Sequence, residues 1–488
     1  MIRKAILFLG CSMALQWAAA QSVEQKLATL KDSATMPASK QYSNLSFFKR
    51  IFLGKNYRTV WSEPVRLPVF HLKELGFTVD KLGGGQQTKS LRLRDPKGRE
   101  WALRTIDKDV EGALPKWLRN TLAQKVVQDM VSAAHPYAPL TITPLAKAIN
   151  VTVPPAYFFI VPDDPDFGEH RQLFANTVCM LEDRHPTPDK KETENTENTV
   201  EDLLEKNKYR VAQLEVLRAR LLDMLIADWD RHQDQWRWGV RDSAGFDFYY
   251  SIPRDRDQAY FYSGGLLVKA AQLISLRHLV GFTNSTRRVK SLSAKSWNFD
   301  RFFLNGLSKE DWQQTIQYVQ AQLTDETIRN AVRKLPPDIY ALSGATLESK
   351  LINRRNGLLK DALRYYQFLA KEVTVAGTDD AEHFSITGNK DKLVLTVYTM
   401  GSNPKELYSR AFDPAETNTI HLVALGGDDK LDVAEGADAR IRLTFDGGGG
   451  NNTVQLNNKK RKKIYQSDLT AAAYEIVMKD QLKIPLEE

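Results

Sequence analysis

The chain has 488 residues, of which 42% are hydrophobic and 26% charged, so its length and composition predict a globular protein of two or three domains. The net charge of +8 does not indicate nucleic-acid binding, because Arg3 and Lys4 contribute two of these charges and KKRKK at 459–463 contributes five. A disulfide framework is excluded, since Cys11 and Cys179 are the only cysteines and Cys11 lies in a leader.

The N-terminus has the pattern of a secretory signal peptide over residues 1–20. MIRK is a positive segment, AILFLGCSMALQW is apolar, and three alanines precede Gln21. We therefore expect export and a periplasmic or secreted location in a Gram-negative cell envelope. No later segment reaches the roughly 20 apolar residues of a transmembrane helix, so no bilayer span is expected.

Residues 21–45 are polar and predict a poorly ordered lead-in. A small lobe is expected over 46–184, formed by strands and one long helix. The strand predictions rest on a glycine turn, alternating residues and apolar runs, in the segments TVDKLGGGQQTKSLRLRD, EWALRTID at 100–107, PPAYFFIVPDD and LFANTVCMLED. The helix is predicted over 114–135, with apolar residues on one face at Leu118, Leu122, Val126, Val127 and Met130.

The chain changes character after residue 184. Residues 185–208 are polar and repetitive (ETENTENT) and predict a surface insertion or flexible connector. A helical lobe is expected over 209–371, beginning with a helix at 209–230 and including a strand pair around FDFYYSIP. Residues 372–455 predict an all-β module, and 456–488 a basic tail. The predicted fold class is α+β.

Two acidic motifs contain the candidate catalytic and metal-binding carboxylates: WDRHQDQW at 229–236 and IPRDRDQAYF at 252–261. A glycine turn lies in the small lobe, and the acidic motifs lie in the helical lobe. Phosphoryl transfer needs a backbone loop and a cation at the phosphates, an acid that orients the hydroxyl acceptor, and carboxylates for magnesium. The order of these parts suits that chemistry.

These motifs resemble those of atypical, secreted protein-kinase-like proteins of the spore-coat CotH type, which are related in layout to Golgi casein kinases and HipA-like kinases. From about 75 to 450 the chain is also similar to uncharacterised periplasmic segments found beside metallophosphoesterase or outer-membrane barrel domains in Gram-negative bacteria. The resemblance implies a two-lobed kinase-like domain with Mg (or Mn) and ATP as cofactors. It makes Asp230 the catalytic Asp that orients and deprotonates the acceptor hydroxyl, and Asp257 or Asp255 a metal ligand. Gln235 stands where kinases place a metal-binding Asn and offers the metal a side-chain carbonyl oxygen, with Asp234 as the alternative ligand.

The resemblance also implies nucleotide-binding positions in the small lobe, with two departures. Position 104 carries Arg where the family has Lys, and the helix at 114–135 offers Asp129 where a bracing Glu is usual. Glu182 follows an apolar strand at the place of a nucleotide hinge. The remaining candidates are in the glycine turn and just after it: Gly83, Gly84, Gly85 and Lys89.

Each signal has a structural alternative. The acids at 228, 230 and 234 also suit a solvated helix end, although acids are unfavourable at the C-terminus of a helix. Asp255 and Asp257 lie between arginines, which allows an ion-pair network. His232 suits a structural hydrogen-bonding role, and the aromatic residues suit packing: Trp229, Trp236 and Trp238. Arg104 alternatively is an ordinary exposed strand residue.

Two further features have open interpretations. LGGDDKLDV at 425–433 and DGGGGNN at 446–452 resemble single turns of calcium-binding repeats, but tight turns between strands explain them as well. Cys179 lies in an apolar strand and is expected to be an inert core residue.

Two functions remain. One is an exported phosphotransferase that uses Mg–ATP. The other is a catalytically degenerate pseudokinase-like binding module that acts with an envelope protein or an outer-membrane assembly partner. The basic tail adds an expected peripheral membrane contact.

Overall fold

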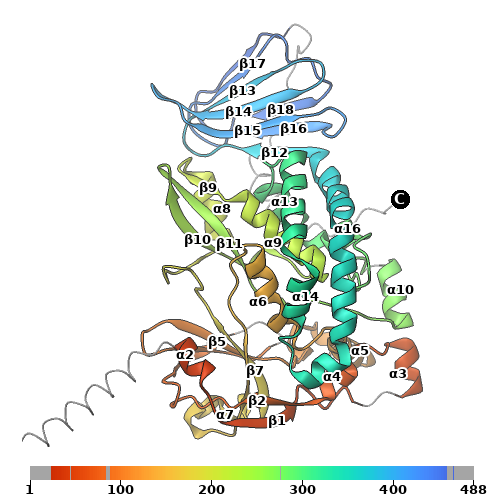
Figure 1. Cartoon of the computed structure of the whole chain (residues 1–488). Helices are drawn as coiled ribbons and strands as arrows, with labels where there is room; N and C mark the ends of the chain where they lie inside the picture. The colour runs from red at the N-terminus through yellow and green to blue at the C-terminus, as the bar shows by residue number, and fades with distance from the viewer. Residues whose placement is uncertain (1–22, 44–45, 84–87, 275, 459–464, 467–488) are drawn as a thin grey trace, which may run out of the picture. The chain divides into compact units, whose positions relative to one another are not determined.

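The computed structural model describes residues 23–43, 46–83, 88–274, 276–458 and 465–466 (Figure 1). Contacts divide the chain into two compact units. Unit 1 comprises the described residues within 1–44, 58–131 and 155–184, and unit 2 comprises those within 45–57, 132–154 and 185–488. Mixed helices and sheets in both units confirm the predicted α+β class.

Unit 1 is built on a five-stranded sheet in which every neighbouring pair is antiparallel. Its strands, in spatial order, are β3 (Thr78–Gly83), β4 (Ser90–Arg94), β5 (Glu100–Thr105), β7 (Thr177–Asp183) and β6 (Tyr157–Val161). All four predicted strand segments are therefore strands. Directly opposed residues share a sheet face, and one face buries Leu91, Leu103 and Leu181 in the hydrophobic core.

Two predictions for unit 1 are corrected. The lead-in is ordered from Val23: α2 (Val23–Ala28) places Val23 and Leu27 on one helical face, and both are buried in the core of this unit. A short strand, β1 (Ser33–Pro37), then pairs with β2 (Pro64–Pro68).

The predicted helix over 114–135 is shorter. Residues 116–118 form a 3-10 turn, and Asn120 adopts a left-handed conformation (φ 61°), which interrupts the helix. The helix therefore starts afresh at α5 (Leu122–Met130), where the Thr121 side chain accepts the amide of Gln124 as an N-cap. The unit also contains α4 (Arg58–Ser62) and α7 (Arg171–Phe174).

Unit 2 contains most helices and a four-stranded sheet in the order β8-β10-β11-β9. The helices outside the region of the acidic motifs are α3 (Phe47–Phe52), α6 (Ala138–Ala148), α10 (Leu266–Ile274), α11 (Val289–Leu292), α12 (Trp297–Phe303), α13 (Lys309–Gln322), α14 (Asp325–Val332), α15 (Pro337–Ile339) and α16 (Ala345–Ala370). Residues 132–154 belong here rather than with the predicted small lobe, because α6 packs on α14.

The segment 185–208 is folded, which corrects the prediction of a flexible insertion. It forms β8 (Glu194–Asn195), which pairs with β10, and α8 (Thr196–Glu205). The Asn195 side chain caps α8, and Thr196, Thr199 and Val200 are buried. Within the described residues, no helix combines the length and the apolar character needed to cross a bilayer.

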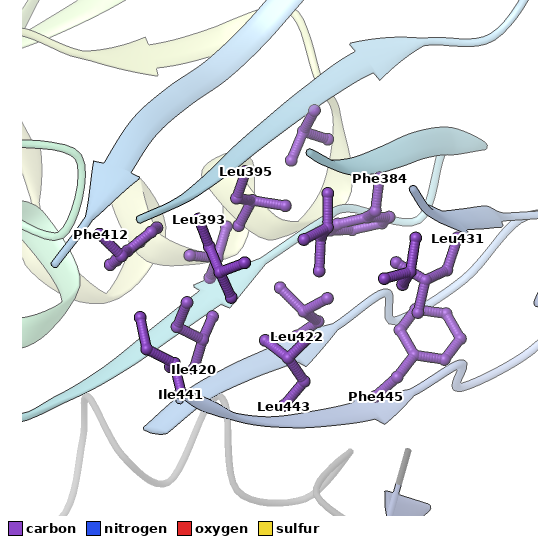
Figure 2. Close-up of a cluster of buried hydrophobic side chains, with 14 of the residues drawn as sticks. Phe384, Leu393, Leu395, Phe412, Ile420, Leu422, Leu431, Ile441, Leu443 and Phe445 are labelled. Atoms are coloured by element: carbon purple, nitrogen blue, oxygen red, sulfur yellow. The ribbon is translucent and has the colours of Figure 1, made fainter. Parts of the chain in front are cut away.

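The predicted all-β module is a two-sheet roll. The strands β12 (Glu372–Ala376), β16 (Thr419–Val423), β18 (Arg442–Asp446) and β20 (Tyr465–Gln466) form one parallel sheet. The other sheet has the order β15 (Glu406–Phe412), β14 (Leu393–Thr399), β13 (Glu382–Gly388), β17 (Lys430–Val433) and β19 (Thr453–Leu456). The chain forms an antiparallel meander, β13 to β15, in this second sheet and alternates between the two sheets from β15 onward. Apolar side chains from both sheets fill the space between them (Figure 2).

Candidate functional site

The helix that carries the first acidic motif ends before that motif begins. The predicted helix at 209–230 is a short strand, β9 (Tyr209–Val211), followed by α9 (Gln213–Ile226). Ala227 adopts a left-handed conformation (φ 54°) and its amide donates to carbonyls of the last turn. Residues 228–235, here called the acidic loop, therefore leave the helix at a sharp turn.

A buried arginine from α16 closes the end of α9. The Arg354 side chain donates to the carbonyl oxygens of Met224 (2.5 Å) and Leu225 (2.6 Å). These carbonyls belong to the last turn, where intrahelical donors are missing and a cation is favourable. Burial lowers the pKa of Arg354 to about 9, which leaves it charged at neutral pH. The start of the acidic loop is thus fixed by a residue far away in sequence.

Asp223 is the centre of a buried ion-pair cluster beneath the acidic loop. Its carboxylate lies 2.8 Å from Arg220, 2.6 Å from Arg256 and 3.4 Å from Arg231. Burial alone would raise the pKa of Asp223, but the three guanidinium groups outweigh it and hold the pKa below its usual value. The cluster joins α9, the acidic loop and the second acidic motif.

Asp228 is a second buried carboxyl group and has the opposite shift. Burial, together with the charges of Asp223 and Asp257, raises its pKa to about 7 against the opposing effect of Arg231. One carboxyl oxygen accepts the backbone amide of Asp230 at 3.2 Å. The other is buried and has no hydrogen-bond partner among the described residues. Asp228 thus positions Asp230, and its charge is sensitive to that of Asp257.

Arg231 ties the two acidic motifs together. Its Nη1 donates to the Gln235 side-chain oxygen (2.6 Å) and to the Arg254 carbonyl (2.5 Å), while the Arg254 amide donates to the Gln235 carbonyl (2.9 Å). The two motifs lie at adjoining ends of β10 (Trp236–Ser243) and β11 (Phe246–Pro253), which pair from Trp236 and Pro253 onward. This strand pair confirms the one predicted around FDFYYSIP.

The structure gives different surroundings to the proposed metal ligands. Gln235 is buried, and its side-chain oxygen faces a guanidinium, an arrangement that disfavours a metal cation there. Asp234 is largely exposed, and His232 lies 3.5 Å from its carboxylate. Asp255 and Asp257 are partly buried, and Asp255 has a left-handed conformation (φ 52°).

The charge of Asp257 acts on Asp228, so the two carboxyl groups are near each other. Mg²⁺ in phosphotransferases needs only one or two carboxylates beside the phosphates, so Asp257 could hold such an ion. Among the described residues, no three His, Cys, Asp or Glu side chains gather as a metal site. The metal role of Asp257 stays a prediction, as does calcium in the roll.

Asp230 is partly buried, and its carboxylate lies 2.6 Å from the Nζ of Lys295. Lys295 also lies over the ring of Trp229, 5.0 Å from its centroid. The neighbouring Ser296 donates to the Arg231 carbonyl at 2.5 Å. His278 packs 5.2 Å from Trp229, and its pKa is lowered by burial and by the charge of Lys295.

Lys295, Ser296 and His278 could not be predicted from the sequence, because nothing in the local sequence links them to Asp230. The same holds for Thr196, whose hydroxyl donates to the Gln233 carbonyl of the acidic loop at 2.7 Å. The only available signal was indirect: residues 258–299 contain basic residues and no Asp or Glu.

The register of the unit 1 sheet places three nucleotide-binding candidates on one face. Gly83 pairs with Ser90, Ser90 with Arg104, and Arg104 with Met180. Glu182 lies two residues beyond Met180 on the same strand, so it shares their face, which is opposite the hydrophobic core. One oxygen of the buried Glu182 carboxylate has no hydrogen-bond partner among the described residues.

The other candidates of unit 1 are placed as follows. Lys89 is exposed, and its carbonyl accepts the Thr105 amide at 3.0 Å. Asp129 is buried and accepts two hydrogen bonds from the guanidinium of Arg58. Gly84 and Gly85 lie outside the described residues. The nucleotide roles of all these residues stay predictions.

Several structural alternatives are confirmed. Trp236 stacks on Phe299 and Trp238 on Phe303, with centroids 4.6 and 4.5 Å apart, so both indoles are core residues. Cys179 is buried, and burial raises the pKa of its thiol to about 12, as expected for an inert cysteine. The two glycine segments of the roll connect β16 to β17 and β18 to β19 as turns.

Two cavities of unit 2, of about 520 and 240 Å³, lie around Arg210 and Phe248, and no residue of the acidic loop lines either one. Only Asp234 of the acidic loop is exposed, and Asp228, Arg231 and Gln235 are buried beneath it.

Comparison with known proteins finds neither a protein-family model nor a curated protein that matches this chain. Two solved kinases are similar in structure. The Helicobacter pylori proinflammatory kinase CtkA is 11% identical with a TM-score of 0.31, over 59% of this chain and 96% of that one. The Rio2 kinase–ADP/Mg²⁺–phosphoaspartate complex from Chaetomium thermophilum is 10% identical with a TM-score of 0.24, over 65% and 82%. At these scores the likeness carries no argument about function.

Proposed function

We propose that this protein is a kinase-like phosphotransferase that acts in the cell envelope and transfers a phosphoryl group from Mg–ATP to a hydroxyl acceptor. The observation that carries the proposal is the acidic loop. It presents Asp230 at the end of a buried helix, and Arg231 locks it to the motif that contains Asp257. Export rests on the leader at residues 1–20, which lies outside the described residues.

In the proposed phosphoryl transfer, the residues have separate roles. Asp230 orients the acceptor hydroxyl and takes its proton. Asp257 holds the magnesium ion, with Asp255 as the alternative ligand, and this ion neutralises charge on the phosphates when it is bound. Within unit 1, the family resemblance assigns Arg104 and Gly83 to the phosphates and Glu182 to the nucleobase. Lys295, whose Nζ lies 2.6 Å from the Asp230 carboxylate, holds that carboxylate in position.

A nucleotide-dependent thermal shift tests the binding half of this proposal. We expect Mg–ATP to raise the melting temperature of the wild-type chain, because a ligand that binds the folded state stabilises it. Asp257→Ala should abolish the shift, whereas Asp230→Asn should retain it, because only Asp257 is assigned to the metal–nucleotide complex. Asp242→Asn is the matched control, since Asp242 is exposed on β10 and belongs to neither acidic motif. No shift with the wild-type chain would refute nucleotide binding.

A second function, a pseudokinase-like binding module of an outer-membrane or surface-export system, is favoured by a specific observation. The Gln235 side-chain oxygen accepts a hydrogen bond from Arg231, so the residue at the position of the usual second metal ligand is already engaged by a cation. Under this alternative the thermal shift occurs without phosphoryl transfer by any variant. A measurement of phosphoryl transfer from radiolabelled ATP separates the two functions.

A further inference from the structure

A contiguous exposed apolar surface lies on the short helix α3 and the start of α10, two elements of unit 2 that contact each other (Figure 1). This surface, the α3/α10 patch, consists of Phe47, Phe48, Ile51, Phe52, Leu266 and Leu267. The side chains of Phe47 and Phe48 are 72% and 71% exposed, and no residue of α3 is buried. Several large apolar side chains exposed on two contacting elements indicate an interaction surface.

Close backbone packing fixes the two helices as one surface. A side chain at Gly265 would place its Cβ 2.4 Å from the carbonyl oxygen of Phe52. A Cβ at Gly54, which has φ of +90°, would likewise lie 2.8 Å from the amide nitrogen of Gly265. Both glycines therefore allow α3 to lie directly against the start of α10. The Ser46 side chain accepts the Lys49 amide and caps α3.

The charges within the two segments that form the patch all have one sign. Lys49 and Arg50 stand between the apolar residues of α3, and Lys55 and Lys269 are exposed nearby in the sequence of each element. Neither 46–57 nor 258–299 contains an Asp or a Glu, although charged residues of both signs are abundant in the rest of the chain.

We propose that the α3/α10 patch docks on the surface of an anionic lipid bilayer. Aromatic and aliphatic side chains interleaved with lysine and arginine suit the boundary between headgroups and acyl chains, where the apolar groups insert and the cations meet anionic headgroups. A protein partner suits the patch less well, because the cores of protein interfaces are depleted in lysine. The docking surface is independent of the proposed phosphotransferase activity and of the basic run at 459–463.

Vesicle co-sedimentation tests the proposal. The chain from Gln21 onward is used, because it retains every described residue and removes the apolar leader, which would itself bind lipid. The probe is a vesicle of phosphatidylcholine with about one third phosphatidylglycerol, compared with pure phosphatidylcholine, at about 0.1 M and about 0.5 M NaCl. Replacing the five basic residues of 459–463 with alanine in every variant removes the tail as a competing site.

Two double variants remove the two parts of the patch. Phe47→Ser with Phe48→Ser deletes the apolar part, and Lys49→Glu with Arg50→Glu reverses the charge. Met400→Ser with Val454→Ser is the matched control, because these side chains are 48% and 49% exposed in the roll. All targeted residues are exposed, and circular dichroism and the melting temperature verify that each variant folds.

We expect the wild-type chain to bind anionic vesicles at least about tenfold more tightly than neutral ones, with weaker binding at high salt. Each patch variant should lose at least about tenfold in affinity, and the control should stay within about twofold. Equal binding of wild-type and patch variants would overturn the proposal, as would absence of binding. The remaining alternative is that the patch is a contact between two copies of this chain. Sedimentation velocity tests it: self-association of the wild-type chain that only the patch variants abolish would overturn the lipid-docking proposal.

Discussion

Asp223 shows at the scale of one residue how the acidic loop is supported. It contacts three arginines that come from α9, the acidic loop and the second acidic motif, and all four side chains are buried. A buried carboxylate with several cations is costly to remove, because its partners stay buried with uncompensated charge. The sequence analysis predicted a functional loop here but not this support, since the arginines are recognisable as partners only in three dimensions.

Asp223→Asn is therefore expected to reduce the free energy of unfolding by about 3–5 kcal/mol. Chemical denaturation of the wild-type chain and the variant measures the difference. Asp234→Asn, in the exposed part of the same loop, should change stability by less than about 0.5 kcal/mol. Equal stability of the two variants would show that the buried cluster does not support the fold.

Asp429 provides a second prediction at this scale, on pH dependence. Its carboxyl group is buried in the roll, accepts the Glu382 amide at 2.7 Å and has a pKa raised to about 7 by burial and by the neighbouring acids Glu382 and Asp428. A raised pKa in the folded state favours folding while the group is protonated. This contribution is complete below about pH 4 and is lost as the pH rises through about 7.

Asp429→Asn should remove this loss, because an amide does not titrate and Asn452 occupies the corresponding position in the next coil of the roll. Stability measured from pH 4 to pH 8 should fall less steeply in the variant, which should exceed the wild-type chain by about 1–2 kcal/mol at the upper end. Asp391→Asn, in an exposed turn, is the control. Parallel pH profiles for wild type and Asp429→Asn would contradict the assignment.

At the scale of elements, the sequence predicted the unit 1 strands best, because alternating residues and apolar runs are local signals. It missed α8, whose residues 196–198 read as a polar repeat. Its burial depends on only a few side chains, of which Thr196 also binds the Gln233 carbonyl. The parallel pairing of the roll was missed as well, because Ala376 and Val423 become neighbours only across a whole coil.

The N-cap of α8 tests whether this segment is an integral part of unit 2. The Asn195 side chain accepts the Asn198 amide at 2.7 Å, and Asn195→Ala should lower the free energy of unfolding by about 1 kcal/mol. Urea denaturation measures this change, with Glu201→Gln on the exposed face of α8 as the control. A flexible insertion, as the sequence suggested, would show no difference between the two variants.

At the scale of the whole molecule, the chain separates the candidate parts of a phosphotransferase between its two units. Unit 1 places Gly83, Arg104 and Glu182 on one sheet face, and unit 2 presents Asp230 and Asp257 on linked loops. These residues were suggested by the resemblance of their segments to kinase-like proteins, and their roles stay predictions. The sequence did not identify Lys295, which reaches Asp230 from an unrelated segment.

Magnesium-dependent phosphoryl transfer from radiolabelled ATP by the wild-type chain tests the central claim most directly. We expect transfer to the chain itself or to an added envelope extract, reduced about 10²–10⁴-fold by Asp230→Asn, with Mg–ATP binding retained. Asp242→Asn, exposed on β10 and outside both acidic motifs, should transfer at close to the wild-type rate. Transfer that Asp230→Asn leaves unchanged, or nucleotide binding with no transfer to any acceptor, would contradict it.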